Sequence, residues 1–211
     1  MMRPDRAFIL EHSPRTFVRR AANTLVNTLV LCVGVTMLAA CKSNGPTVFD
    51  DASAIAVLAA TPGSSVHGVV TFVRAGDATQ VNANLSGFKP NSTHGIHVHE
   101  LGDCSAHDAT SAGEHFNPES SAHGAPGAPE HHAGDLGNVT ADARGDVYTT
   151  FKISQGSFGT GNDSIIGRGL IVHADRDDLH SQPAGNSGAR LACGSITRNP
   201  DRMTVAKSGQ S

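Results

Sequence analysis

Residues 93–99 have the sequence Thr-His-Gly-Ile-His-Val-His, in which apolar and imidazole side chains alternate from position 96 onward. Successive side chains of a β-strand point to opposite faces. His97 and His99 would therefore share one face, while Ile96 and Val98 would pack into a core on the other. Two neighbouring imidazoles can take adjacent corners of a metal's coordination sphere. The pattern is weak evidence alone, because an exposed strand face explains it more often than a metal site does.

The chain on either side of this strand is patterned as further short strands, separated by turns rich in Gly, Asn, Asp and Pro. Polar and apolar residues alternate with a period of two over 80–85 and again over 147–153. No amphipathic helix is evident in the sequence. We predict an all-β fold, an antiparallel sandwich or flattened barrel with strands at 54–59, 66–73, 80–85, 93–99, 136–140, 147–153, 169–173 and 189–197.

Two connections are much longer than turns. Residues 101–134 are rich in Gly, Pro, Ser and His, and residues 174–188 form a second, more polar connection. Loops of this length inside a compact domain are usually functional or disordered. The first contains too many metal-binding side chains to be a simple spacer.

The composition narrows the class of protein. The chain has 211 residues, which is enough for one domain and a leader, and its net charge of −3 comes without a long basic run. Nucleic acid is therefore not an expected partner. The 23 glycines suit a turn-rich β-protein, and most of the 12 histidines lie between His94 and His132.

The N-terminus has the pattern of an export signal. A positive region that ends at Arg20 precedes an apolar stretch from about 25 to 40, which is short for a transmembrane helix. The stretch ends in Leu-Ala-Ala-Cys at 38–41, which resembles the lipobox of bacterial lipoproteins, in which the Cys is acylated. We therefore predict lipidation at Cys41; a plain cleaved signal peptide with an incidental Cys is the alternative.

The predicted organisation is a lipoprotein signal peptide at 1–40, a flexible tether at 41–51, a folded domain at 52–199 and a disordered tail at 200–211. Cys32 would leave with the signal peptide, so Cys104 and Cys193 would be the only other thiols of the exported chain. Two cysteines in an oxidising compartment are expected to pair.

Further metal-binding residues follow the first strand. His115, His123 and His132 lie along the first long connection, Asp135 follows three residues after His132, and His173 ends a predicted strand. Six histidines and one carboxylate exceed one tetrahedral site and suit two metals that share a ligand. Imidazole serves both copper and zinc. His131 could replace His132, although His132 keeps the His-x-x-Asp spacing.

Four segments, in this order and spacing, resemble the copper/zinc superoxide dismutases: Gly-Ile-His-Val-His-Glu at 95–100, Ser-Ala-Gly-Glu-His-Phe-Asn-Pro at 111–118, His-Ala-Gly-Asp-Leu-Gly-Asn at 132–138 and Gly-Ala-Arg-Leu-Ala-Cys-Gly at 188–194. The resemblance extends over about 54–197. It implies a Greek-key antiparallel sandwich, a flattened eight-stranded barrel with two long functional loops. It also implies disproportionation of superoxide to dioxygen and hydrogen peroxide, by one-electron cycling of copper, with zinc structuring the site.

The resemblance also implies the site residues. Copper would be bound by His97, His99, His115 and His173, and zinc by His115, His123, His132 and Asp135. Asp177 would link a copper histidine, His97, to a zinc histidine, His123. His115 and Arg190 would be catalytic, with Arg190 beside the copper, although Arg190 could also be a structural guanidinium. The Cys104–Cys193 disulfide would anchor the long loop to the sheet.

Some interpretations remain open. Glu114 precedes His115, where the resemblance leads us to expect a small residue or Pro, and it could add negative potential or simply face solvent. A metal-buffering lipoprotein, an Ig-like interaction module and a copper-only enzyme are the alternatives to the dismutase. We expect a periplasm-facing, lipid-anchored protein that protects the bacterial envelope from superoxide. A homodimer is one option for its assembly.

Overall fold

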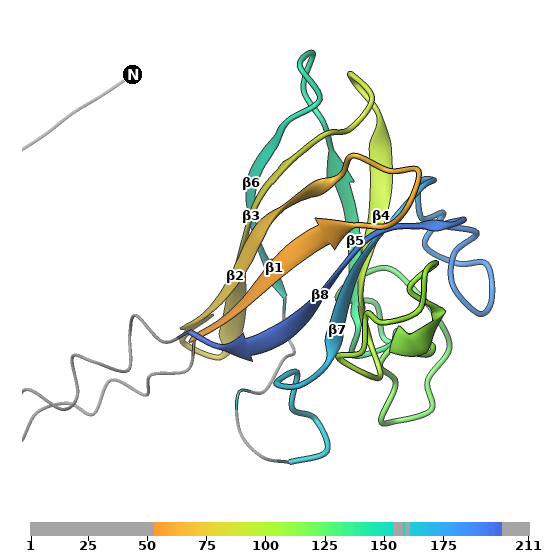
Figure 1. The fold of residues 1–211 in the computed structure, drawn as a ribbon. Helices are drawn as coiled ribbons and strands as arrows, with labels where there is room; N and C mark the ends of the chain where they lie inside the picture. The colour runs from red at the N-terminus through yellow and green to blue at the C-terminus, as the bar shows by residue number, and fades with distance from the viewer. Residues whose placement is uncertain (1–52, 154–157, 159–160, 200–211) are drawn as a thin grey trace, which may run out of the picture. The chain divides into compact units, whose positions relative to one another are not determined.

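The computed structural model describes residues 53–153, 158 and 161–199 (Figure 1). The predicted signal peptide, the tether with Cys41 and the predicted tail at 200–211 lie outside these residues. No helix in the described ranges is long and apolar enough to cross a membrane.

All eight predicted strands are present, most of them within two residues of their expected ends. The only helical element of the described part is a short 3-10 helix, η1, in the first long connection. The elements are β1 (Ser53–Ala60), β2 (His67–Ala75), β3 (Ala78–Ser86), β4 (Thr93–His99), η1 (Thr110–Ala112), β5 (Asp135–Thr140), β6 (Val147–Ile153), β7 (Gly169–His173) and β8 (Arg190–Arg198).

The strands form one antiparallel sheet in the order β5-β4-β7-β8-β1-β2-β3-β6, which curls into a nearly closed barrel (Figure 1). The chain crosses from β3 to β4 and back from β6 to β7, so that the strands joined by these two connections are not neighbours in the sheet. Such crossovers are typical of a Greek-key arrangement. The predicted all-β class is confirmed.

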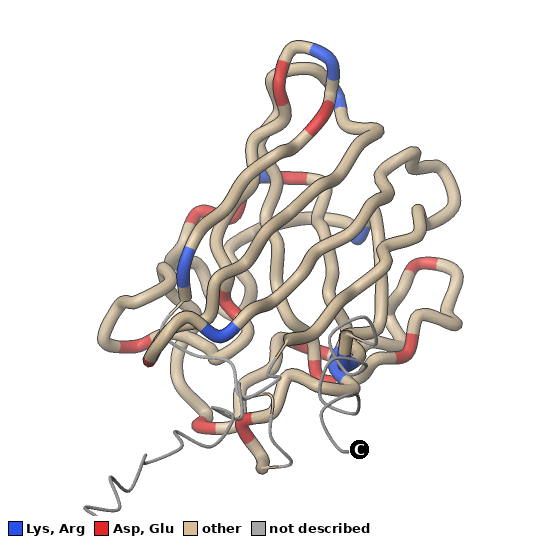
Figure 2. The backbone as a smooth tube through the Cα atoms, turned by 90° about the vertical axis from the view of Figure 1, so that its left-hand side faces the viewer, with Lys and Arg blue, Asp and Glu red and all other residues tan. Residues whose placement is uncertain are grey.

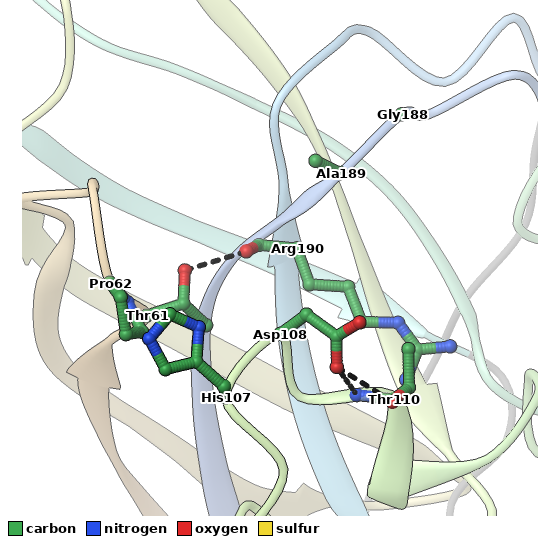
Figure 3. A pocket seen from close by; sticks show the side chains of 8 residues that line it. All are labelled: Thr61, Pro62, His107, Asp108, Thr110, Gly188, Ala189 and Arg190. Atoms are coloured by element: carbon green, nitrogen blue, oxygen red, sulfur yellow. Dashed lines mark hydrogen bonds between the residues drawn. The ribbon is translucent and has the colours of Figure 1, made fainter.

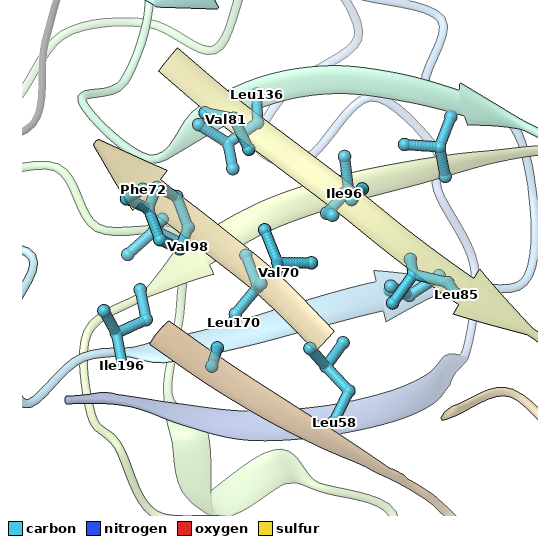
Figure 4. Packing of buried hydrophobic residues seen from close by; sticks show 14 of the residues in the cluster. Leu58, Val70, Phe72, Val81, Leu85, Ile96, Val98, Leu136, Leu170 and Ile196 are labelled. Carbon is cyan, nitrogen blue, oxygen red and sulfur yellow. The ribbon is translucent and has the colours of Figure 1, made fainter. Parts of the chain in front are cut away.

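The barrel interior is filled by the apolar side of each strand. Phe72, Leu85, Ile96 and Leu170 have no exposed surface, and they lie together in Figure 4. Full burial of one such side chain contributes about 1.5–3 kcal/mol. Ile96 and Val98 point into this core, as the period of two predicts, and their neighbours on β4 therefore point to the outer face of the barrel.

Both long connections lie beside that outer face of β4. Cys104 of the first connection forms a disulfide with Cys193 of β8, with their Cα atoms 5.8 Å apart, which confirms the predicted pairing. On the chain-entropy account, a disulfide that closes a loop of this length stabilises the folded state by about 4–5 kcal/mol.

Acidic and basic residues are interspersed, mostly in the turns and connections (Figure 2).

Candidate metal centre

Two buried groups of metal-binding side chains lie next to each other, and His115 belongs to both. Within each group the donor atoms lie within 4.8 Å of one another. β4, the first long connection, the start of β5 and the end of β7 contribute these residues. The first group is His97, His99, His115 and His173, and the second is His115, His123, His132 and Asp135.

Hydrogen bonds fix which ring nitrogen is available in the first group. Nδ1 of His99 donates to the Gly113 carbonyl oxygen at 2.9 Å, and Nδ1 of His173 donates to the Gly188 carbonyl oxygen at 3.2 Å. A carbonyl can only accept, so both Nε2 atoms carry lone pairs. These two Nε2 atoms lie 3.3 Å apart. His97 is oriented the other way, because its Nε2 faces a carboxylate oxygen of Asp177 at 2.8 Å.

Two atoms of this region are buried without a hydrogen-bond partner among the described residues, Nδ1 of His97 and Nε2 of His115. Leaving a buried polar atom unsatisfied costs about 1–3 kcal/mol. Both atoms are the free nitrogens of their rings, and both rings belong to the first group. The residues present therefore fit a metal ion held by four imidazoles.

The second group is organised around Asp135. Its Oδ1 lies 2.9 Å from Nδ1 of His115, 3.0 Å from Nδ1 of His123 and 3.3 Å from Nδ1 of His132. Its Oδ2 accepts the backbone N–H groups of Gly124 and His132 at 3.1 and 2.8 Å. Three imidazole nitrogens around one carboxylate oxygen match the donor set of a tetrahedral zinc site.

Asp177 joins the two groups from outside. Its Oδ2 lies 2.8 Å from Nε2 of His97, and its Oδ1 lies 3.0 Å from Nε2 of His123. The backbone of Asp177 is held in turn by Asn138, whose Oδ1 accepts the Asp177 N–H at 2.8 Å and whose Nδ2 donates to its carbonyl at 3.0 Å. Asn138 ends one of the quoted motifs, but nothing in that motif indicates this role.

Gly185 allows this close approach. Its φ of +62° is in the left-handed region, and a Cβ there would overlap Oδ1 of Asp177 and come within 2.7 Å of Nε2 of His123. A side chain at this position would therefore separate the carboxylate from the ring that it orients.

Burial keeps three imidazoles of the first group neutral. It lowers the pKa of His99 to about 2, that of His173 to about 3 and that of His97 to about 4. Burial also lowers the pKa of His123, but the carboxylates of Asp135 and Asp177 outweigh this effect and raise it to about 9. Neutral imidazole is the form that binds metals, so His97, His99 and His173 need no deprotonation to accept an ion at neutral pH.

These shifts predict the acid sensitivity of the metal-free protein. In the unfolded chain, the three imidazoles of His97, His99 and His173 take up protons as the pH falls through about 6.5, whereas the folded protein cannot. Protonation therefore favours the unfolded chain, and the free energy of unfolding falls as the pH is lowered. His123 acts in the opposite direction, because its pKa is raised in the folded protein. Its contribution to the free energy of unfolding is complete below about pH 6.5 and is lost as the pH rises through 9. Three groups outweigh one, and we expect the metal-free protein to lose about 2 kcal/mol or more between pH 7 and pH 5.

Urea unfolding of the metal-free protein at the two pH values measures this loss. An unfolding midpoint at pH 5 equal to or above the midpoint at pH 7 would contradict the prediction.

Arg190 borders the first group. Its Nη1 donates to the Ala109 carbonyl at 2.7 Å and its Nη2 donates to the Gly113 carbonyl at 2.6 Å. The Gly113 carbonyl also accepts from His99, so one oxygen connects the guanidinium to the histidine group. Figure 3 shows Arg190 in a pocket of about 360 Å³, lined also by Thr61, Pro62, His107, Asp108, Thr110, Gly188 and Ala189.

The structure also places the remaining histidines. His131 is outside both groups and contacts the Ala128 carbonyl oxygen through Nδ1 at 2.8 Å, so His132 is the residue that joins the second group. His94 is buried and bridges the His173 carbonyl oxygen and the Ser92 hydroxyl, at 2.8 and 2.6 Å. His67, His107 and His180 are exposed.

Comparison with known proteins agrees with this geometry. Residues 66–196 match the family described as "Copper/zinc superoxide dismutase (SODC)". The chain is 40% identical over 174 residues to the "Superoxide dismutase [Cu-Zn]" of Paramecium bursaria Chlorella virus 1, and the match covers 80% of this chain and 90% of that protein. The crystal structure of the clock protein EA4 is similar, with a TM-score of 0.63 and 36% identity, over 70% of this chain and 94% of that one. The chain therefore belongs to the copper/zinc superoxide dismutase family, and the two histidine groups fit its copper and zinc sites.

Proposed function

We propose that this superoxide dismutase acts in the bacterial cell envelope, with copper bound by the first histidine group and zinc by the second. The observation that carries the assignment is the position of His115 in both groups. Its Nδ1 faces Asp135 of the second group, while its buried Nε2 remains for the first. One imidazole is thus placed to contact both ions.

The donor sets support this distribution of the metals. Copper supplies one-electron redox chemistry, which zinc lacks, so the dismutation of superoxide must take place at the copper group. The second group contains a carboxylate and is enclosed by the first long connection. Its role is to hold that connection and to orient His115.

The residues around the copper group suit a small anionic substrate. Two superoxide anions and two protons give dioxygen and hydrogen peroxide, so the site must attract an anion and supply protons. Arg190 carries a permanent charge, and its two backbone contacts fix the plane of the guanidinium while using two of its five N–H groups. Nε2 of His115, which has no hydrogen-bond partner among the described residues, could hold a proton for the product whenever it is not bound to the ion.

Removing and restoring the metals tests the proposal. We expect the metal-free protein to be inactive, copper and zinc together to restore rapid loss of superoxide, and zinc alone to restore none. A protein that binds both metals but does not consume superoxide would instead be a metal-buffering protein. Activity with zinc alone would refute the assignment of the redox group.

Asp108 weakens the attraction of the anion. Its carboxylate accepts from the backbone N–H and the hydroxyl of Thr110 at 3.0 and 2.6 Å, and Figure 3 shows it beside the Arg190 side chain. We expect Asp108→Asn to raise the second-order rate constant about two-fold at low ionic strength. The gain should vanish near 1 M salt, where the Debye length is about 3 Å.

Asp77→Asn is the matched control for this charge change, because Asp77 and the pocket lie at opposite ends of β1. The β2–β3 turn that contains Asp77 lies beyond Ser53, at the start of β1, whereas Thr61 of the pocket follows the end of β1. Equal rate constants for Asp108→Asn and Asp77→Asn at low salt would contradict the role given to Asp108.

The envelope location rests on the N-terminal sequence. An apolar stretch that ends in Leu-Ala-Ala-Cys at 38–41 supports export and acylation of Cys41, and the Cys104–Cys193 disulfide suits an oxidising compartment. Labelling of the full chain with a radioactive fatty acid in a bacterial host tests this location. Label that is present in the unmodified chain and lost in Cys41→Ser supports the anchor, whereas an unlabelled chain refutes it.

An exposed apolar area supports a homodimer. Val57 of β1 and Leu101 are 65% and 53% exposed. Both residues belong to segments that contact β8, since Gly194 of β8 approaches Val57 and a Cβ at Gly102, next to Leu101, would meet the Ser195 side chain. Sedimentation of the purified protein tests this: a dimer that Leu101→Lys dissociates supports the assembly, and a monomer at every concentration refutes it.

A further inference from the structure

The second long connection contains a loop that holds itself closed, residues 178–186. Oδ1 of Asp178 accepts the backbone N–H groups of His180 and Ser181 at 3.1 and 2.8 Å, and its Oδ2 accepts from Asn186 Nδ2 at 3.0 Å. The backbones of Asp178 and Gly185 also pair at 2.9 Å. The carboxylate of Asp178 thus closes this loop.

Gln182 extends from the 178–186 loop to the first long connection. Its Oε1 accepts the backbone N–H of His123 at 2.9 Å, and its Nε2 donates to the carbonyl of the same residue at 2.9 Å. Nε2 also donates to the His180 carbonyl at 3.1 Å, within its own loop. The amide therefore pairs with both backbone polar groups of His123, as a neighbouring β-strand would.

His123 is thus held to the second connection at two points. Its ring contacts Asp177, which directly precedes the 178–186 loop, at 3.0 Å, and its backbone is bound by Gln182. The other side of the ring faces Asp135 at 3.0 Å. A shift of the His123 backbone would move its Nδ1 away from the second group, although no other residue of that group would change.

We propose that Gln182 is a positioning residue for zinc: it fixes the backbone of His123, so that retention of the ion depends on the 178–186 loop. The proposal rests on the assignment of zinc to the second group. Gln182 does not touch the metal donors, and it acts only through the His123 backbone. Partners that orient metal ligands are typically worth about 10–100-fold in metal affinity.

The experiment measures the release of zinc from the fully metal-loaded protein to a chromogenic chelator. We expect Gln182→Ala to release zinc about ten-fold faster than the unmodified protein. Gln182→Glu keeps the size of the side chain but replaces the donating amide by a carboxylate that faces two carbonyl oxygens, so we expect release at least as fast as from Gln182→Ala. Gln80→Ala is the matched control, because Gln80 lies on β3 and its amide donates to the Asn82 side chain at 3.0 Å, away from both metal groups.

Each outcome decides the proposal. Zinc release at the unmodified rate from Gln182→Ala overturns it, because the side chain would then have no effect on zinc retention. Release at the unmodified rate from Gln182→Glu also overturns it, because side-chain volume alone would then be enough. Equal acceleration in Gln80→Ala would indicate general destabilisation and also overturns it. An unmodified protein that holds copper but no zinc would refute the metal assignment itself, which separates that failure from a failure of Gln182.

Hydrogen exchange gives a readout that does not depend on activity. In Gln182→Ala we expect faster exchange of the His123 amide and of the 178–186 loop, with the amides of β4 unchanged, because the bonds of Gln182 reach only those two segments. Unchanged protection at His123 would overturn the proposal.

Discussion

Replacing Arg190 by Ile should leave both metals bound and lower the second-order rate constant for superoxide by about ten- to a hundred-fold. The guanidinium touches no donor atom of either metal group, and its two hydrogen bonds go to the carbonyls of Ala109 and Gly113. What is lost is the positive charge in the pocket and the fixed set of N–H groups that can orient an anion. Rapid-mixing kinetics on samples of known metal content measure the change.

Two further variants separate charge from geometry. Arg190→Lys keeps the charge but not the planar fork, so we expect a rate between those of Arg190→Ile and the unmodified protein. Arg144→Ile removes an exposed arginine that pairs with Asp142 and Asp146 in the β5–β6 turn, and it should change the rate little. A fully active Arg190→Ile protein with both metals bound would contradict the role of Arg190 in the reaction.

Replacing His115 by Ala should abolish dismutation, with a loss of at least about a thousand-fold, and should weaken the binding of both metals. His115 is the one residue that belongs to both groups, and its ring is buried between them. Its removal leaves the first group with three imidazoles and the second with two imidazoles and a carboxylate. It also removes the nitrogen that can hold a proton for the product.

His131→Ala is the control for this variant. His131 is next to His132 in the sequence, but its ring contacts the Ala128 carbonyl and lies outside both groups. We expect it to keep both metals and full activity. If His115→Ala retained both metals and more than about a tenth of the activity, the shared-ligand account would be wrong.

The strands could be predicted because their signal is local. The period of two over 80–85 and 147–153 marks which side chains face the core, and β3 and β6 extend over these ranges. The disulfide could be predicted because Cys104 and Cys193 are the two cysteines of the predicted folded domain. The Greek-key arrangement was implied by the family resemblance, since local patterning does not reveal which strands become neighbours.

The metal-binding residues could be predicted for a different reason. Histidines with fixed spacing are rare enough to be recognised, and all seven residues named from the sequence lie in the two groups. The residues that support them could not be predicted in this way. Asn138, Asp178 and Gln182 are ordinary polar residues whose partners lie on another segment or on the loop backbone, and such contacts leave no periodic pattern.

The most direct test of the central claim is the electron paramagnetic resonance spectrum of protein with copper(II) in the first group and cobalt(II) in place of zinc. If both ions bind the same imidazole, of His115, their unpaired electrons are coupled and the ordinary copper signal should be largely lost. Reduction of the copper should then leave the cobalt spectrum of an isolated ion. A copper signal of full intensity beside bound cobalt would contradict the account, because it would show that the two ions do not share a ligand.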